Sequence, residues 1–154
     1  MYRRGFTIVE LLIVIVVIAI LAAITIVAYN GIQDRAKMSR MQSDLTSLNK
    51  TIQLYRAAND SYPVSTSWRC SNTYPTDYIP GVVPAFTSSL PADTGAGGSY
   101  CYRTNNGGVD YKIIRLNQPS IAASEWALVP AAMKDTNTSL VDRWGYWSSN
   151  GSAL

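Results

Sequence analysis

The chain has 154 residues, with 13 Lys and Arg side chains, 10 Asp and Glu side chains and a formal net charge of +3. A charge this small makes nucleic acid an unlikely partner, although it does not exclude one. The sequence contains two Cys and no His, which excludes Ser-His-Asp and Cys-His catalysis, His-containing zinc sites and four-thiolate zinc sites. We therefore predict no catalytic, cofactor-binding or metal site, and a protein that is not an enzyme.

The first predicted element is an apolar helix that is long enough to cross a membrane. Every residue from Leu11 to Ala28 is apolar except Thr25, and about 20 apolar residues span a bilayer. Arg3 and Arg4 precede this segment, so the positive-inside rule places the N-terminus in the cytoplasm and the rest of the chain outside. A cleaved secretory signal peptide would have a shorter apolar core, whereas a plain signal anchor would explain both the length and the arginines.

Glu10 lies one turn inside the start of the apolar helix, and neither a signal peptide nor a plain anchor explains it. A carboxylate in a membrane span costs about 2.5–3.5 kcal/mol on insertion scales, and such residues generally have a function. We therefore expect Glu10 to have a partner.

The helix is predicted to continue beyond the membrane segment, from Phe6 to about Ala58, and to stop before Tyr62–Pro63. Apolar residues recur in its second half at intervals of three and four, as on one face of a helix. This face is expected to pack on a small domain; a coiled-coil seam is the alternative, although fewer than three heptads is short for one. Its members are Met38, Met41, Leu45, Leu48, Ile52 and Tyr55.

Residues 59–98 are rich in Ser, Thr, Pro, Gly and Asp and are predicted to form a long loop. Cys70 lies in this loop and Cys101 lies beyond it. Two Cys in one exported domain more often pair with each other, so we predict a disulfide within the chain; pairing between chains is the alternative. The bridge would close a loop of about 30 residues and stabilise the domain by about 3–4 kcal/mol.

An antiparallel sheet is predicted over residues 99–148, which gives an α+β fold. The segment Ser99–Leu116 has two alternating stretches around the turn Asn105–Gly108, as in a β-hairpin. A third strand is predicted at Trp126–Val129 and a fourth at Arg143–Ser148. One face of the sheet is expected to lie on the helix and the other to face outward.

The C-terminal third also contains a concentration of large aromatic side chains. Core and cross-strand packing is the favoured interpretation, and an exposed adhesive or subunit-contact patch is the alternative. Strand alternation puts Tyr146 and Trp147 on opposite faces, so at least one aromatic side chain is expected to be exposed. The aromatic residues are Trp126, Trp144, Tyr146 and Trp147.

Two weaker signals lie outside these elements. The glycine-rich stretch Ala92–Ser99 is a candidate for binding an anion or, through Asp93, a calcium ion, but it has neither a phosphate-loop nor an EF-hand spacing and is better explained as a loop. Asn137 lies in an Asn-x-Ser sequence and is a candidate glycosylation acceptor, although such short matches are often accidental.

The stretch RRGFTIVELL, from Arg3 to Leu12, resembles the N-terminal motif of the type IV pilin family and its relatives, the type II secretion pseudopilins. It combines a basic leader, a glycine, a phenylalanine, a glutamate after a short gap, and an apolar run. The resemblance implies that a prepilin peptidase cuts between Gly5 and Phe6 and that the new amino terminus at Phe6 is N-methylated. It also implies that Glu10 guides each subunit into a growing filament.

The resemblance implies a leader at residues 1–5, a transmembrane and polymerisation helix at residues 6–29, and a globular pilin head at residues 30–154. The subunit is expected in the cytoplasmic membrane, in contact with lipid, before assembly, and in an extracellular pilus afterwards. Its expected partners are other pilin subunits, the prepilin peptidase and a membrane assembly platform. A pilus subunit, with adhesion and twitching motility as pilus functions, is favoured. A secretion pseudopilin, or a minor tip pilin that binds a surface or DNA, is the alternative.

The residues give this expectation a physical basis. Cleavage would place an ammonium group on Phe6, four residues and about 6 Å along the helix axis from Glu10. Opposite charges attract strongly in a low dielectric, and either is costly when left unpaired. We therefore predict that Glu10 pairs with the Phe6 amine of its own chain or of a neighbouring subunit.

The chain departs from the family pattern at Val27, where many members have proline and their helices can unwind locally on assembly. Asn30–Gly31 lies a few residues further on and could take that role, because glycine costs about 1 kcal/mol in a helix interior.

Overall fold

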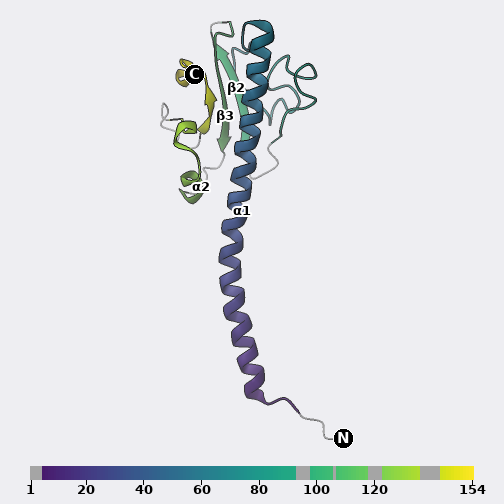
Figure 1. Ribbon diagram of the computed structural model, residues 1–154, viewed down its shortest axis with the longest axis vertical. Helices are drawn as coiled ribbons and strands as arrows, with labels where there is room; N and C mark the ends of the chain where they lie inside the picture. The colour runs from purple at the N-terminus through teal and green to yellow at the C-terminus, as the bar shows by residue number, and fades with distance from the viewer. Residues whose placement is uncertain (1–4, 93–97, 106, 118–122, 136–142) are drawn as a thin grey trace. The chain divides into compact units, whose positions relative to one another are not determined.

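The computed structural model describes residues 5–92, 98–105, 107–117, 123–135 and 143–154, with the side chains of all of these except Val27, Ala28, Asn117 and Ala123. The chain divides into two units, with the boundary between Lys37 and Met38. In chain order the elements are α1 (Ile8–Asn59), β1 (Arg69–Cys70), β2 (Gly98–Asn105), β3 (Asp110–Asn117), α2 (Ala123–Ala127), η1 (Ala131–Met133), β4 (Arg143–Trp147) and η2 (Gly151–Ala153) (Figure 1).

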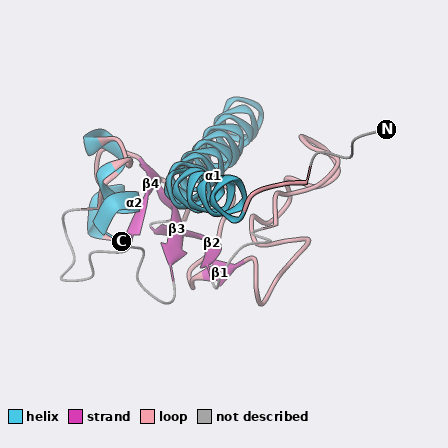
Figure 2. Ribbon diagram, turned by 90° about the horizontal axis from the view of Figure 1, so that it is seen from below, coloured by secondary structure: helices cyan, strands magenta, loops and turns pink. Residues whose placement is uncertain are grey.

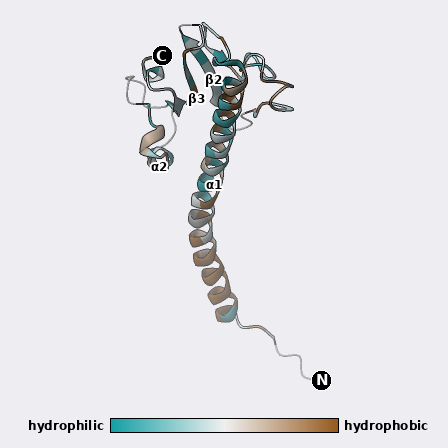
Figure 3. Cartoon of the chain, turned by 45° about the horizontal axis from the view of Figure 1, so that its top comes forward, coloured by the Kyte–Doolittle hydropathy of each residue, from teal (hydrophilic) through white to brown (hydrophobic). Residues whose placement is uncertain are grey.

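Helix α1 matches the predicted helix to within two residues at either end. Figure 3 shows that its first half is hydrophobic apart from a hydrophilic stretch at its start, whereas the second half alternates between hydrophobic and hydrophilic residues. The helix ends because Asp60 adopts a positive φ of 57°, and its N–H donates to the carbonyl of Arg56 at 2.8 Å. The Asn59 side chain also donates to the Tyr55 carbonyl at 2.9 Å. A left-handed residue that satisfies a late carbonyl is a common end of a helix.

The core of the second unit forms between the apolar face of α1 and one face of the sheet. The predicted helix residues from Met38 to Ile52 are all buried, and Tyr55 is partly buried. Opposite them lie the buried sheet residues Tyr102, Ile113 and Trp144, and Figure 2 shows the strands on one side of α1. The prediction that this face packs on a small domain is therefore confirmed.

The four strands form one antiparallel sheet in the order β1-β2-β3-β4. The predicted hairpin and the predicted fourth strand are confirmed, because β2 and β3 pair over their whole length and β4 pairs with β3. Gly108 in the hairpin turn has a φ of 91°, and a Cβ there would lie 2.5 Å from the Tyr62 carbonyl oxygen. The Tyr62 N–H donates to the Gly108 carbonyl at 2.8 Å, so the turn and the chain after α1 approach too closely for a side chain.

The prediction of a third strand at Trp126–Val129 is wrong. Trp126 lies in the short helix α2, and the N–H of Leu128 donates to the carbonyl of Glu125 at 3.0 Å. The reason is twofold: Ala and Glu in this segment favour a helix, and β4 already pairs with the free side of β3. Val129 is buried in the core despite its different backbone.

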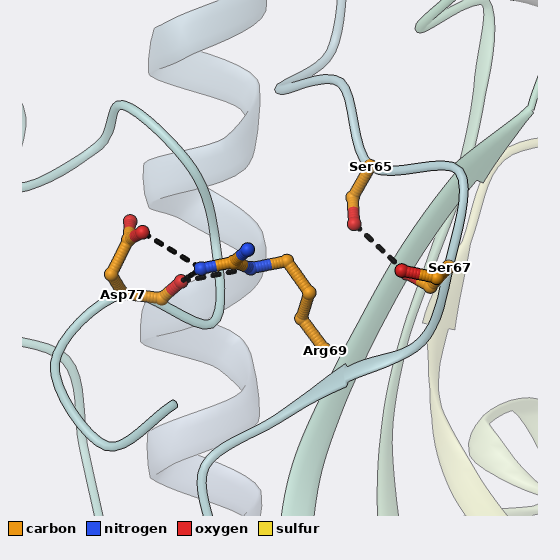
Figure 4. Close-up of polar contacts among 4 residues, drawn as sticks. All are labelled: Ser65, Ser67, Arg69 and Asp77. Atoms are coloured by element: carbon orange, nitrogen blue, oxygen red, sulfur yellow. Dashed lines mark hydrogen bonds and ion pairs between the residues drawn. The ribbon is translucent and has the colours of Figure 1, made fainter. Parts of the chain in front are cut away.

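The long segment between α1 and β2 is irregular apart from the two-residue strand β1, which the sequence did not predict. Side chains fix its course (Figure 4). Arg69 donates to the Asp77 carboxylate at 2.8 Å and to the Asp77 carbonyl, while the Ser65 hydroxyl donates to the Ser67 carbonyl at 2.9 Å. The guanidinium of Arg69 also lies 4.0 Å from the centre of the Tyr74 ring.

The aromatic residues of the C-terminal third contribute to packing. Trp144 is fully buried, whereas Trp126, Tyr146 and Trp147 are partly buried. The hydroxyls of Tyr146 and Thr46 lie 3.1 Å apart and form a hydrogen bond. Core packing, the favoured interpretation, therefore holds for Trp144, and the other three retain some exposed surface. Asp93 and Asn137, the residues of the two weaker signals, lie outside the described residues.

Cys70 and Cys101 lie directly opposite each other in β1 and β2 and form a disulfide within the chain, with a sulfur–sulfur distance of 2.04 Å. Their sequence separation is 31 residues, so the bridge closes most of the irregular segment. The half-buried strand β1 has only two residues, and the bridge fixes it to the sheet.

The double variant Cys70→Ser/Cys101→Ser is expected to lower the free energy of unfolding by about 3–4 kcal/mol, because the unfolded chain loses its cross-link. The measurement is denaturant unfolding of the detergent-solubilised chain, followed by tryptophan fluorescence. Wild-type protein in reductant is the matched control and is expected to unfold at the same midpoint as the double variant. A wild-type midpoint that reductant does not move would contradict this account of the bridge.

Candidate functional site

The first half of α1 and the residues just before it form an exposed apolar surface. All described side chains from Gly5 to Ile26 are exposed, including the Phe6 side chain at 84%. By length and composition, α1 is the one helix among the described residues that could cross a membrane. An apolar surface of this extent is far larger than a soluble monomer exposes. It therefore requires lipid or other apolar helices around it.

Glu10 and Thr7 cap the N-terminus of α1 reciprocally. The Glu10 carboxylate accepts hydrogen bonds from the Thr7 N–H at 2.8 Å and from the Thr7 hydroxyl at 2.7 Å. In return, the Thr7 hydroxyl accepts a hydrogen bond from the Glu10 N–H at 3.2 Å. This arrangement is a capping box, in which the side chains of Thr and Glu three residues apart satisfy free N–H groups of the first turn.

The capping box gives Glu10 a partner that the sequence analysis did not identify. The sequence does carry a signal for this capping box, because Thr-x-x-Glu directly before an apolar run is typical of a helix N-terminus. The Phe6 nitrogen is a peptide nitrogen in the uncut chain, so the predicted pair between Glu10 and a Phe6 ammonium can form only after cleavage. Glu10 therefore has a local role in the helix, and the intersubunit role remains a prediction.

Gly5 and Phe6 precede the first residue of α1 and are both exposed. A Cβ built on Gly5 would meet no atom within 4 Å, so the fold itself does not require glycine at this position. The peptide bond between the two residues is open to an enzyme that would cut it. Arg3 and Arg4 lie outside the described residues.

The backbone of α1 is helical throughout the region where local unwinding was considered. Asn30 and Gly31 both lie within the helix, and the Thr25 hydroxyl donates to the Ala22 carbonyl at 3.0 Å. A Cβ on Gly31 would meet no atom within 4 Å. The single chain thus holds a continuous helix here.

The second unit contains buried polar groups whose role is structural. Burial raises the pKa of Tyr111 to about 12, and electrostatic repulsion from the neighbouring Tyr62 hydroxyl group adds to this effect. Burial likewise raises the pKa values of Tyr78 and Tyr102. These three hydroxyls stay protonated at neutral pH and act as hydrogen-bond donors. Among the described residues, no group of three or more His, Cys, Asp or Glu side chains could hold a metal ion.

Comparisons with known proteins agree with the N-terminal geometry. The family model described as the prokaryotic N-terminal methylation motif matches residues 1–26. The type II secretion system core protein G of Klebsiella michiganensis is 33% identical over 63 residues, which are 41% of this chain and 44% of the relative. The corresponding protein of Escherichia coli is 32% identical over 63 residues, 41% of this chain and 43% of the relative.

One relative with a different name matches further into the chain. The type IV major fimbrial protein FimA of Dichelobacter nodosus is 32% identical over 97 residues, which are 62% of this chain and 59% of that protein. The chain thus covers less than half the length of the two secretion proteins and more than half the length of the fimbrial protein. No solved structure matches it significantly.

Proposed function

We propose that this chain is the structural subunit of a type IV pilus; its N-terminal methylation motif, its α+β architecture and its relatives support a place among the type IV pilins and type II secretion pseudopilins. The observation that carries this proposal is the exposed apolar half of α1 with one carboxylate in its first turn. Such a surface can be covered by lipid before assembly and by identical helices in a filament.

The proposed sequence of events begins in the cytoplasmic membrane, with the N-terminus inside. A prepilin peptidase removes residues 1–5, and the amine of Phe6 is methylated. A membrane assembly platform then transfers the subunit from lipid into the filament, where residues 6–29 polymerise and residues 30–154 form the outer head. In this scheme the protein is a structural component and performs no catalysis.

A second candidate function is that of a pseudopilin in type II secretion. The matches to core protein G support it, but they cover only about two fifths of the chain. The match to the fimbrial protein extends over 97 residues and therefore reaches well into the head, which favours the pilus. A minor tip pilin, with a head that contacts a surface or DNA, is a variant of the first proposal.

Deletion of the gene for this protein in the cell that makes it is the experiment that separates these functions. A pilus subunit is expected to be abundant in filaments sheared from the cell surface, and its loss should abolish filaments, with twitching and adhesion as secondary readouts. A pseudopilin is expected to be scarce in sheared material, and its loss should leave exported enzymes inside the cell. Normal filaments together with blocked enzyme export would overturn the pilus proposal.

The mature chain is expected to begin at Phe6 with a methylated amine, which intact-mass analysis of the exported protein would detect. Gly5→Leu is expected to block leader removal while leaving the fold unchanged, since nothing lies within 4 Å of a Cβ at this position. Gly31→Leu is the matched control, because its Cβ also points into open space and its leader should be removed normally. Complete processing of the Gly5→Leu variant, or an exported form that retains Met1, would contradict the assignment.

A further inference from the structure

A polar cleft lies in the second unit, between α1 and the last part of the loop before β2. Its volume is about 260 Å³. In Figures 1 and 2 this loop lies beside α1, on the side away from α2. The loop wall is formed by Thr87, Ser89, Leu90, Pro91 and Ala92. The helix wall consists of Arg40, Asp44, Ser47, Leu48 and Thr51, whose spacing places them on one face of α1.

The surface of the cleft combines hydroxyl groups with a small apolar floor. Ser47 and Thr51 contribute hydroxyls from the helix, and Thr87 and Ser89 contribute them from the loop. The floor contains a pair of buried leucines, Leu48 and Leu90. A hydroxyl group can both donate and accept, so these walls suit a ligand that is itself rich in hydroxyl groups.

Buried tyrosines hold both walls in place. The hydroxyl of Tyr100 donates to one oxygen of the Asp44 carboxylate at 2.8 Å, and the hydroxyl of Tyr78 donates to the carbonyl of Pro91 at 2.8 Å. Both tyrosine side chains are almost fully buried. The cleft is therefore formed before any ligand arrives, as is usual for small-molecule sites.

Charged groups at the cleft are available for binding. Among the described residues, no hydrogen bond or ion pair engages the guanidinium of Arg40, and the Asp44 carboxylate has one oxygen beyond the one that Tyr100 holds. A guanidinium binds a carboxylate through two parallel hydrogen bonds, and a carboxylate oxygen accepts hydrogen bonds from hydroxyl groups.

We propose that this cleft binds a single acidic sugar residue, such as a hexuronic acid within a surface polysaccharide. Arg40 would pair with the sugar carboxylate, and Asp44 and the Ser and Thr hydroxyls would bind the ring hydroxyls. The volume lies just below the range of about 300–1,000 Å³ for drug-sized ligands, so it suits one sugar residue rather than a chain. This site goes beyond the role of filament subunit and does not depend on it.

The test is a titration of the full-length chain, solubilised in a detergent without a sugar headgroup, with D-glucuronate and with D-glucose. Binding is followed by saturation-transfer NMR and calorimetry, so no filament is required. Glucuronate is expected to bind more tightly than glucose. Arg40→Gln is expected to weaken glucuronate binding about tenfold, the effect of losing one strong charge-assisted interaction, and to leave glucose binding unchanged.

The matched control is Lys50→Gln, which removes one positive charge from an exposed position of the same helix but does not line the cleft. It should bind both sugars as wild type does. Ser89→Trp, which fills the cleft from the exposed loop, should abolish binding of both sugars while the unfolding midpoint stays unchanged. Absence of glucuronate binding, equal losses in Arg40→Gln and Lys50→Gln, or full binding by Ser89→Trp would each overturn the proposal.

Discussion

Replacement of Glu10 by alanine is expected to abolish filament assembly while membrane insertion and head folding remain intact. Insertion should improve, because a charge that costs about 2.5–3.5 kcal/mol leaves the apolar segment. In the filament, however, the Phe6 ammonium of a neighbouring subunit would enter the apolar bundle without its counter-charge. An uncompensated buried charge costs about 3–5 kcal/mol, which reduces the equilibrium constant for each added subunit by a factor of roughly a hundred to several thousand.

The structure supplies the control that this experiment needs. Glu10 also caps α1 with Thr7, so loss of assembly in Glu10→Ala could reflect a frayed helix rather than a missing charge. Thr7→Ala removes the capping hydroxyl and keeps the carboxylate, and the loss of a cap costs about 0.5–2 kcal/mol. If the charge guides docking, Thr7→Ala should assemble nearly as well as wild type.

Two further variants complete the series. Glu10→Gln keeps the size of the side chain without its charge and should fail as Glu10→Ala does, whereas Glu10→Asp should be intermediate because it keeps the charge on a shorter side chain. Each variant is compared at equal membrane level and equal leader removal, and sheared polymer is measured. Normal polymer from Glu10→Ala would show that the carboxylate does not drive docking. Failure of Thr7→Ala together with normal assembly of Glu10→Gln, whose amide oxygen can still complete the capping box, would assign Glu10 to the helix cap.

Elements with a strong period could be predicted from the sequence. The intervals of three and four from Met38 to Ile52 place these residues on one face of a helix, and the structure buries that face. The hairpin of β2 and β3 was equally clear, because alternating stretches flank a turn with Gly107 and Gly108, both at positive φ. In both cases the spacing of apolar residues in the sequence follows directly from the geometry of the element in which they lie.

Elements that depend on the rest of the fold could not be predicted in this way. Strand β1 has two residues, too few for any period, and it exists because Cys70 is bonded to Cys101 opposite it. The segment around Trp126 does not form the predicted strand, because the position beside β3 belongs to β4. At the N-terminus, the charge of Glu10 indicates that it has a partner but not which one, and the hydroxyl and N–H of Thr7 form the cap.

Lys112 and Asp135 are the clearest case of a pair that no local pattern indicates. They are 23 residues apart in the sequence, yet their side chains form an ion pair at 2.9 Å and each is only 1% exposed. The ammonium of Lys112 also donates to the Ser152 carbonyl at 2.9 Å and lies 5.8 Å from the centre of the Trp147 ring. The ion pair therefore links β3 to the segment after η1. The hydrogen bond from Lys112 to the Ser152 carbonyl links β3 to η2 as well.

Removal of either member of this pair is expected to destabilise the second unit by about 3–5 kcal/mol, because a buried ion pair then loses one of its two charges. Lys112→Met leaves a buried carboxylate, and Asp135→Asn leaves a buried ammonium. The double variant removes both charges and should lose much less than the sum of the two single losses. The measurement is denaturant unfolding of the four proteins in detergent, and Lys50→Gln, at an exposed position, is the control for charge alone. Additive losses in the double variant would show that the two charges do not depend on each other, and that the apolar stem of Lys112 accounts for its effect.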